Sequence, residues 1–547
     1  MPEPIDTPVL IVGGGPVGLS LALDLAWRGN RSTLIEREPG TGVELLAKAN
    51  GLHERTMETC RRWGLVHKVM EVGFPRDHAG DSVYCTSLMG HFIGRSVIPS
   101  ANLRPTPPES PEKRQRCPQY EFDPLLARAV QERALTDLRY GVAFRDLEQD
   151  DHGVTAIVRE VATGREYPLR AGYLIACDGA GSRVRRSIDV PFDGRMLDFS
   201  LSAMIRIRDL AEHHPIRDGE RYILIGPDGA WGIMTSVDGR GIWRFTMVGS
   251  QEKLDPARYD VSADIRRALG SDAIEFEILR LVPWRRSQCV AASYRRGRVL
   301  LAGDSAHTTS PTGGHGMNTG IADAMDLSWM LDALLKGWGG EQLLSAYDLE
   351  RRPVGIRNSA NAAANYQGWL EKSGYADVLT EGPAGDACRE EIGRRLVASL
   401  HGEWNSLGID LGYRYEHSPV IVSDGSPPTA DETSEYVPTA RPGHRAPHAW
   451  LADGRSTLDL FGRGFVLLRF GPNPPDTQGI EQAAARAGVS LQIVDLQEPH
   501  IVVLYERRLV LVRPDGQVAW RADESPADCQ LLIDTVRGAR AVQSVGA

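Results

Sequence analysis

A glycine-rich segment near the N-terminus constrains the fold of this chain more than any other feature. The segment Gly13-Gly14-Gly15-Pro16-Val17-Gly18 has the G-x-G-x-x-G pattern, and it directly follows the apolar run Val9–Val12. The apolar stretch Leu19–Trp27 comes next, so the expected order is strand, tight turn and helix. Glycines let the backbone approach a pyrophosphate, and the helix N-terminus supplies N–H groups and a positive dipole end. We therefore expect a nucleotide contact at Gly13, Gly15, Pro16, Val17 and Gly18.

An acidic residue at the end of the next strand strengthens this interpretation. The apolar strand Ser32–Ile35 ends at Glu36, about twenty residues after the glycines, where an acid accepts hydrogen bonds from a ribose. Glu36 and its neighbour Arg37 are therefore candidate cofactor contacts. Together with the glycines, they predict a dinucleotide site without specifying which dinucleotide.

Two later segments indicate FAD. The segment Cys177-Asp178-Gly179 follows a buried-strand run, and Gly303-Asp304-Ser305-Ala306-His307 follows the strand pattern Arg298–Ala302. Asp304 is well placed to bind a ribityl hydroxyl. The loop Pro311–Asn318 then leads into a helix, whose first N–H groups can face the pyrimidine edge of a flavin. Alone, each segment also has an ordinary interpretation as a turn or a glycine loop.

Composition limits the partners and the class of protein. The chain has 547 residues, 42% of them hydrophobic, which is enough for two or three domains. The net charge is −10 and no basic block occurs, so we expect neither nucleic acid nor a membrane as a partner. No apolar run reaches about eighteen residues, and the acidic N-terminus does not resemble a signal peptide. The seven cysteines lack C-x-x-C spacing, which predicts reduced thiols, a cytoplasmic protein and no metal site.

The alternation of strand and helix patterns predicts an α/β protein with a discontinuous nucleotide domain. Helical periodicity is expected at 54–65, 124–135 and from about 320 to 365, whereas short strands are expected around 82–98 and 199–281. The expected FAD-binding domain comprises 1–80, 101–191 and 285–395. A β-rich substrate domain, 81–100 and 192–284, is inserted into it. Residues 396–547 are expected to form a linker and a third α/β domain.

Together these motifs resemble the class A FAD-dependent aromatic hydroxylases, which have the para-hydroxybenzoate hydroxylase fold. The resemblance rests on GGGPVG, CDGAGS and GDSAH with PTGGHGMN, and it continues through Gln119–Asp123 and Glu350–Val354. It extends to the C-terminus through Arg441–His448 and Val512–Gly516. The pattern is similar to the phenol and chlorophenol hydroxylase and polyketide-tailoring branch. That branch implies a Rossmann-like domain of the glutathione-reductase type and a thioredoxin-like C-terminal domain without redox cysteines.

The resemblance assigns roles to the FAD contacts. It implies that the glycines carry the pyrophosphate, that Glu36 holds the adenosine ribose, and that Gln119 and Asp304 contact the ribityl–phosphate region. Asp178 resembles an element that serves both FAD and the nicotinamide coenzyme. Lys48 stands where many relatives have arginine. The residues that would surround the flavin ring are Pro311, Gly314, His315, Gly316, Met317 and Asn318.

The implied reaction is the hydroxylation of a phenolic or related activated aromatic compound. NADPH or NADH reduces FAD, the reduced flavin reacts with dioxygen to give a C4a-hydroperoxide, and its distal oxygen is transferred to the ring. The protein supplies a dry pocket, orientation and electrostatics. A base near the phenol oxygen is expected, because the phenolate enriches the ortho and para carbons. Relatives are often homodimers.

One sequence leaves the base and the pocket residues open. The candidate catalytic residues are His53, Tyr222, Arg244 and His315, each with packing or surface exposure as the alternative. Candidates for the substrate pocket are Trp231, Met234 and Phe245, for which core packing is the alternative, together with the loop residues Pro311 and Gly313.

Three other functions compete with this interpretation. A flavin halogenase would have a W-x-W-x-I-P motif, and no W-x-W occurs here. A non-catalytic binding protein on the same scaffold would not need the complete loop Pro311–Asn318. A flavin oxidase or dehydrogenase is separated from a monooxygenase by product analysis with labelled dioxygen. The substrate, the ring position attacked, the choice between NADPH and NADH, and the oligomeric state are left open.

Overall fold

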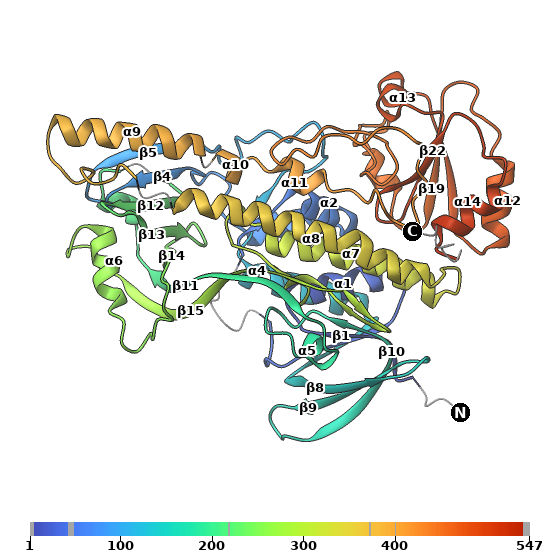
Figure 1. Cartoon of the computed structure of the whole chain (residues 1–547), viewed down its shortest axis with the longest axis horizontal. Coiled ribbons are helices and arrows are strands. Elements are labelled where there is room, and N and C mark those ends of the chain that lie inside the picture. The colour runs from blue at the N-terminus through green and yellow to red at the C-terminus, as the bar shows by residue number, and fades with distance from the viewer. Residues whose placement is uncertain (1–4, 42–48, 217–218, 371–372, 400, 540–547) are drawn as a thin grey trace.

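The fold places three large sheets and one two-stranded sheet along one elongated molecule (Figure 1). The computed structural model describes residues 5–41, 49–216, 219–370, 373–399 and 401–539, so the candidate Lys48 lies outside the described residues. No helix in the described ranges is long and apolar enough to span a membrane. All seven cysteines are free thiols.

The first sheet brings the nucleotide motifs together. It has eight strands in the order β16-β17-β10-β1-β2-β7, with β9 paired to β10 and β8 paired to β9. Strands β17, β10, β1, β2 and β7 run parallel, with Val12 opposite both Ala176 and Ile35, and Ala176 opposite Leu301. The carboxyl ends of adjacent parallel strands therefore meet at one edge, where ligands bind in such sheets. The strand bounds are β1 Thr7–Val12, β2 Ser32–Glu36, β7 Thr136–Tyr140, β8 Val142–Gln149, β9 Val154–Glu160, β10 Glu166–Ala176, β16 Arg295–Arg296 and β17 Val299–Leu301.

Helices cover this sheet and begin at its motif edge. Helix α1 packs against both α4 and α7, and α7 packs against the long helix α8. The short strand β3 pairs with β6 beside the same edge. The bounds are α1 Pro16–Trp27, α2 Glu54–Trp63, α3 Val66–Val72, α4 Gln119–Arg133, α5 Arg183–Ser187, α7 His315–Leu335, α8 Gln342–Trp369, β3 Gly51–Leu52, β6 Gln115–Arg116 and the 3-10 turn η2 Gly303–Ser305.

The second sheet is largely antiparallel and has the order β18-β15-β11-β14-β13-β12-β4-β5. One face packs on α6 and carries its own apolar core, and the other face packs against α8 and α9. The bounds are β4 Ser82–Cys85, β5 Phe92–Ser96, β11 Phe192–Arg206, β12 Arg221–Gly226, β13 Gly229–Ser236, β14 Ile242–Met247, β15 Glu277–Ala291, β18 His307–Thr308, α6 Val261–Leu269, α9 Pro383–Ser399 and the 3-10 turn η1 Leu210–His213.

The C-terminal part contains a smaller mixed sheet with the order β20-β19-β21-β22. A buried ion-pair network joins it to the rest of the molecule, because Arg513 binds Glu350 of α8 at 2.6 Å and also pairs with Asp515. The bounds are α10 His401–Trp404, α11 Leu407–Leu411, η3 Thr457–Leu460, β19 Phe465–Phe470, α12 Gln478–Arg486, β20 Leu491–Leu496, α13 Pro499–Tyr505, β21 Leu509–Val512, β22 Val518–Ala522 and α14 Cys529–Val536. The expected α/β class is confirmed. The thioredoxin-like character of this part and the domain boundaries stay predictions.

Candidate functional site

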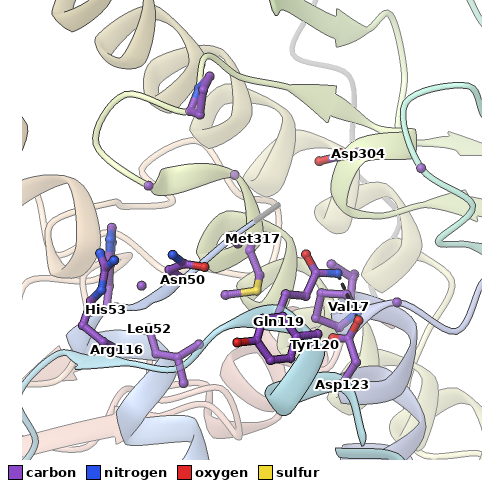
Figure 2. Close-up of a pocket in the computed structure, with 18 of the residues that line it drawn as sticks. Val17, Asn50, Leu52, His53, Arg116, Gln119, Tyr120, Asp123, Asp304 and Met317 are labelled. Carbon is purple, nitrogen blue, oxygen red and sulfur yellow. Dashed lines mark hydrogen bonds between the residues drawn. The ribbon is translucent and has the colours of Figure 1, made fainter. Parts of the chain in front are cut away.

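A cavity of about 900 Å³ lies along the carboxyl edge of the first sheet and reaches the second sheet. Figure 2 shows His53 and Arg116 toward one end of this cavity and Val17 and Asp123 toward the other. Most of the residues that the sequence nominated line its wall: Gly13, Gly15, Pro16, Val17, Glu36, Arg37, His53, Gln119, Asp178, Arg244, Asp304, Pro311, Gly313, Gly314, Gly316 and Met317.

Two glycines of the turn at one end of the cavity, Gly13 and Gly18, leave no room for a side chain. Gly13 has φ of +113°, and a Cβ there would overlap the carbonyl oxygen of Cys177. A Cβ on Gly18 would overlap the carbonyl of Gly13, so Gly18 supports the turn from behind and does not line the cavity. The Glu36 carboxylate accepts a hydrogen bond from the Gly14 N–H at 2.6 Å. This bond holds an acid beside the start of α1.

Several polar atoms at the cavity wall fit a polar ligand. Both amide atoms of Asn50 are buried without a hydrogen-bond partner among the described residues, and so is Oδ1 of Asp178. The other oxygen of Asp178 accepts hydrogen bonds from the N–H groups of Arg183 and Val184 at 2.7 and 3.1 Å. Because buried polar groups are normally satisfied, these atoms fit the ribose, phosphate and ribityl groups of FAD. The exposed Asp304 lies at the same wall.

The start of α7 forms another wall. Gly313 and Gly314 have φ of +89° and +73°, and Gly314 is the N-cap of the 21-residue helix. Gly314, Gly316 and Met317 line the cavity, whereas Asn318 lies behind them and binds the turn. Its Oδ1 accepts from the His53 N–H at 2.9 Å, and its Nδ2 donates to the Gly314 carbonyl at 2.8 Å. The wall is therefore fixed to the segment that carries His53.

His53 belongs to a buried cluster with His315 and Asp410, of which the sequence predicted the two histidines but not Asp410. Its Nδ1 lies 2.7 Å from Oδ1 of Asp410, which comes from the short helix α11. His315 is 1% exposed and lies behind the cavity wall, with its Nδ1 3.8 Å from the same oxygen. No motif marks the segment around Asp410, and only the packing of α11 against α2 brings it here.

Arginines line the end of the cavity near the second sheet. Arg116 pairs with Glu220 at 2.9 Å and Arg221 pairs with Glu403 at 3.0 Å. Burial, followed by the nearby charges of Arg221 and Arg116, lowers the pKa of Arg244 to about 10. Three arginines and two carboxylates leave this largely buried place with a net positive charge, which favours an anionic ligand.

Four nominated residues of the second sheet do not face the cavity. Tyr222, Met234 and Phe245 are buried in the core between the sheet and α6, and Trp231 packs there against Arg267. Their strand neighbours Arg221, Thr235 and Arg244 face the cavity instead. Alternate residues of a strand point to opposite faces, and the sequence did not show which face meets the cofactor. The structure therefore does not place Tyr222, predicted as a catalytic residue, or Trp231, Met234 and Phe245, predicted as pocket residues, at the cavity wall.

Comparison with known proteins agrees with this geometry. Residues 6–362 match the FAD binding domain family, and residues 439–539 match the aromatic-ring hydroxylase, C-terminal family. The chain is 34% identical over 564 residues to tetracenomycin B2 monooxygenase-dioxygenase of Streptomyces olivaceus, covering 97% of this chain and 98% of that protein. The chain belongs to the FAD-dependent aromatic hydroxylases.

Solved structures resemble this hydroxylase along its whole length. The rebeccamycin biosynthetic enzyme RebC, soaked with chromopyrrolic acid and containing 7-carboxy-K252c, is 38% identical with a TM-score of 0.90. That match covers 98% of this chain and 100% of RebC. The flavin-dependent monooxygenase PieE, in complex with FAD and substrate, is 31% identical with a TM-score of 0.85, over 97% of this chain and 99% of PieE. The protein is thus an oxidoreductase with FAD as its cofactor.

Proposed function

We propose that this hydroxylase uses NAD(P)H and dioxygen to hydroxylate a phenolic aromatic substrate that carries an acidic group. The observation that carries the proposal is the continuity of the cavity. It joins the cradle of glycines at α1 and α7 to an end lined by Arg116, Arg221 and Arg244. A flavin ring and a planar acidic substrate would therefore share one cavity.

The residues at the wall would hold FAD in a single orientation. Gly13, Gly15, Pro16 and Val17 would contact the pyrophosphate, and Glu36 and Arg37 the adenosine ribose. Gln119 and Asp304 would contact the ribityl–phosphate region, and Pro311 with Gly314, Gly316 and Met317 the ring. FAD supplies the redox chemistry when bound, because it takes hydride from the nicotinamide coenzyme and activates dioxygen. The chain's own part is to bind, orient and exclude water.

The arginine-lined end supports an acidic substrate. Glu220 and Glu403 each pair with one arginine of this end, and Arg244 lies beside both pairs. Burial and then repulsion lower the pKa of Arg244, and a carboxylate placed among these guanidinium groups would offset both effects. The RebC structure, soaked with chromopyrrolic acid and containing bound 7-carboxy-K252c, is consistent with this assignment.

The nicotinamide coenzyme would bind transiently at the Asp178–Gly179 turn. Within the described ranges, only the segment at residues 13–18 has the G-x-G-x-x-G pattern, so no second nucleotide domain of that kind is present. Reduction would therefore occur at the open side of the FAD cavity. A homodimer and a cytoplasmic location remain predictions, which sedimentation and cell fractionation would test.

The test measures coenzyme oxidation and product together. Purified holoenzyme is mixed with NADPH or NADH and a panel of phenolic acids with their methyl esters, under labelled dioxygen. We expect one labelled oxygen atom in the product, and faster flavin reduction with the acids than with the esters. Coenzyme oxidation that yields only hydrogen peroxide with every aromatic compound would contradict the proposal and favour an oxidase.

A further inference from the structure

Two imidazoles and one carboxylate converge where α2, α7 and α11 meet. The donor atoms of His53, His315 and Asp410 all lie within 4.8 Å of one another, and all three side chains are buried. Asp410 Oδ1 is 2.7 Å from Nδ1 of His53 and 3.8 Å from Nδ1 of His315. Neither ring nitrogen of His315 has a hydrogen-bond partner among the described residues. Asp410 is thus bound to His53, which alone of the two imidazoles lines the cavity.

The bond to Asp410 determines which nitrogen of His53 faces the cavity. Because Nδ1 is used by the carboxylate, Nε2 is the nitrogen available for a ligand. A Cβ on Gly314 would lie 3.2 Å from this Nε2, so the ring is directed at the turn that begins α7. The His53 N–H is fixed by Asn318 at 2.9 Å, which limits movement of the backbone beneath the ring.

The surrounding charges keep Asp410 ionised. Its Oδ2 accepts from Ser406 Oγ at 3.1 Å and from Arg114 Nη2 at 3.3 Å, and Arg114 also pairs with Glu54. Burial alone would raise the pKa of Asp410, but the hydrogen bond from His53 and the charge of Arg114 hold it well below its usual range. Burial lowers the pKa of His315, so this ring stays neutral beside His53, at 5.6 Å between ring centroids.

An ionised carboxylate on Nδ1 makes the opposite nitrogen of an imidazole a better proton acceptor. Such a partner fixes the tautomer and stabilises the imidazolium that forms. A neutral neighbour such as His315 adds no competing positive charge. The arrangement is therefore suited to take up a proton from a group in the cavity.

We propose that His53 accepts the proton of the substrate's phenolic hydroxyl and that Asp410 is the residue that positions it. The inference rests on the proposed function, which supplies the phenol. The phenol O–H bond breaks, an Nε2–H bond forms, and the electron pair stays on oxygen, giving a phenolate and an imidazolium. After oxygen transfer the same proton returns to the phenolic oxygen of the product, so His53 ends neutral.

A bound metal is the competing use of these three side chains. Two histidines and a carboxylate are a common donor set for divalent metals. Here, however, both carboxylate oxygens already accept hydrogen bonds, and one donor is the Arg114 guanidinium, whose charge opposes a second cation. Proton transfer is therefore the function we argue, and metal binding is an outcome of the test.

The test follows the ionisation of a bound phenol. 4-Nitrophenol is titrated on the FAD holoenzyme, and its anion is measured by difference absorbance from pH 5 to 9. In the wild type we expect the bound phenol to ionise at a lower pH than the free phenol. Asp410→Asn and His53→Gln should each raise the midpoint by about one pH unit, which is a tenfold change in the ionisation constant. The double variant should shift no further than His53→Gln.

The controls separate this role from a structural one. Asp495→Asn removes another carboxylate, which pairs with Arg469 at 2.6 Å in the C-terminal sheet, and it should leave the midpoint unchanged. Flavin content and circular dichroism report folding, and His53→Gln carries the test by itself if Asp410→Asn loses FAD. Additive shifts in the double variant, unchanged midpoints in both single variants, or one equivalent of metal per wild-type chain would each overturn the inference. Failure of the wild type to bind or hydroxylate any phenol would instead refute the proposed function.

Discussion

At the scale of single residues, Gly13 is a position of the FAD cavity that does not tolerate a side chain. A Cβ there would overlap the Cys177 carbonyl, and its φ of +113° is strained for any other residue. We expect Gly13→Ala to weaken FAD binding at least about tenfold, or about 1.4 kcal/mol, because the turn must open. The ratio of flavin to protein absorbance after dialysis measures this. Gly181→Ala, whose Cβ would meet nothing within 4 Å, is the matched control; equal flavin loss in both variants would contradict the argument.

The second prediction at this scale concerns the role of Arg244 in substrate binding. If it binds an acidic group, Arg244→Met should raise the KM for an aromatic acid about tenfold or more, as expected for losing a charge-assisted hydrogen bond of about 1.5–3 kcal/mol. The KM for the methyl ester should change little. Steady-state kinetics on both compounds give the comparison. Arg258→Met, at an arginine side chain that is 88% exposed, should behave as the wild type. An equal loss for acid and ester would show that Arg244 does not bind the acidic group.

At the scale of elements, the start of α7 depends on one buried amide. Asn318 accepts from the His53 N–H and Thr56 Oγ1, and donates to the carbonyls of Gly51 and Gly314. Asn318→Ala should lower the free energy of unfolding by about 2–3 kcal/mol, because it leaves buried groups unsatisfied. Denaturant titration of the holoenzyme measures the change. The exposed substitution Asn473→Ala should cost less than about 0.5 kcal/mol. A small effect at Asn318 would mean that the wall is held elsewhere.

Helix boundaries show where local patterns sufficed. The helix expected at 54–65 is α2, Glu54–Trp63, which ends at Gly64 in the left-handed region as helices often do. The helix expected from Pro124 is α4, which begins instead at Gln119, so that Pro124 lies inside the helix. Proline favours the first turn of a helix, so local reading placed the start too late. Helix α9 and the short α11 had no expected counterpart.

At the scale of the whole molecule, Asp326 of α7 is buried where the C-terminal segment packs over this helix. Tyr415 donates a hydrogen bond to it, and Arg351 lies 3.9 Å away. Burial, added to the nearby acids Asp515 and Glu350, raises the pKa of Asp326 to about 7. The folded protein thus keeps a proton on Asp326 that the unfolded chain releases near pH 4.

This pKa predicts how stability depends on pH. Between about pH 4 and 7 the unfolded state binds fewer protons at this site, so Asp326 lowers the stability of the wild type as pH rises. The Asp326→Asn variant does not lose stability at this site as pH rises, because an asparagine does not titrate. Its stability relative to the wild type should increase by about 1.4 kcal/mol per pH unit across that interval and level off above pH 7. Urea unfolding at several pH values measures the difference. The exposed Asp193→Asn should give a flat difference; a flat curve for Asp326→Asn would refute the raised pKa.

The sequence by itself determined the α/β class, the FAD motifs and the family. Motifs at strand ends suffice for this because a turn that must admit a pyrophosphate tolerates few residues, as Gly13 shows. Only the tertiary structure decided which face of the second sheet lines the cavity, where Arg221 lies in place of the expected Tyr222. It also brought Asp410 to His53 across more than three hundred residues. Alternation and spacing are local properties, whereas these pairings depend on how whole elements pack, and nothing in a short segment encodes its distant neighbour.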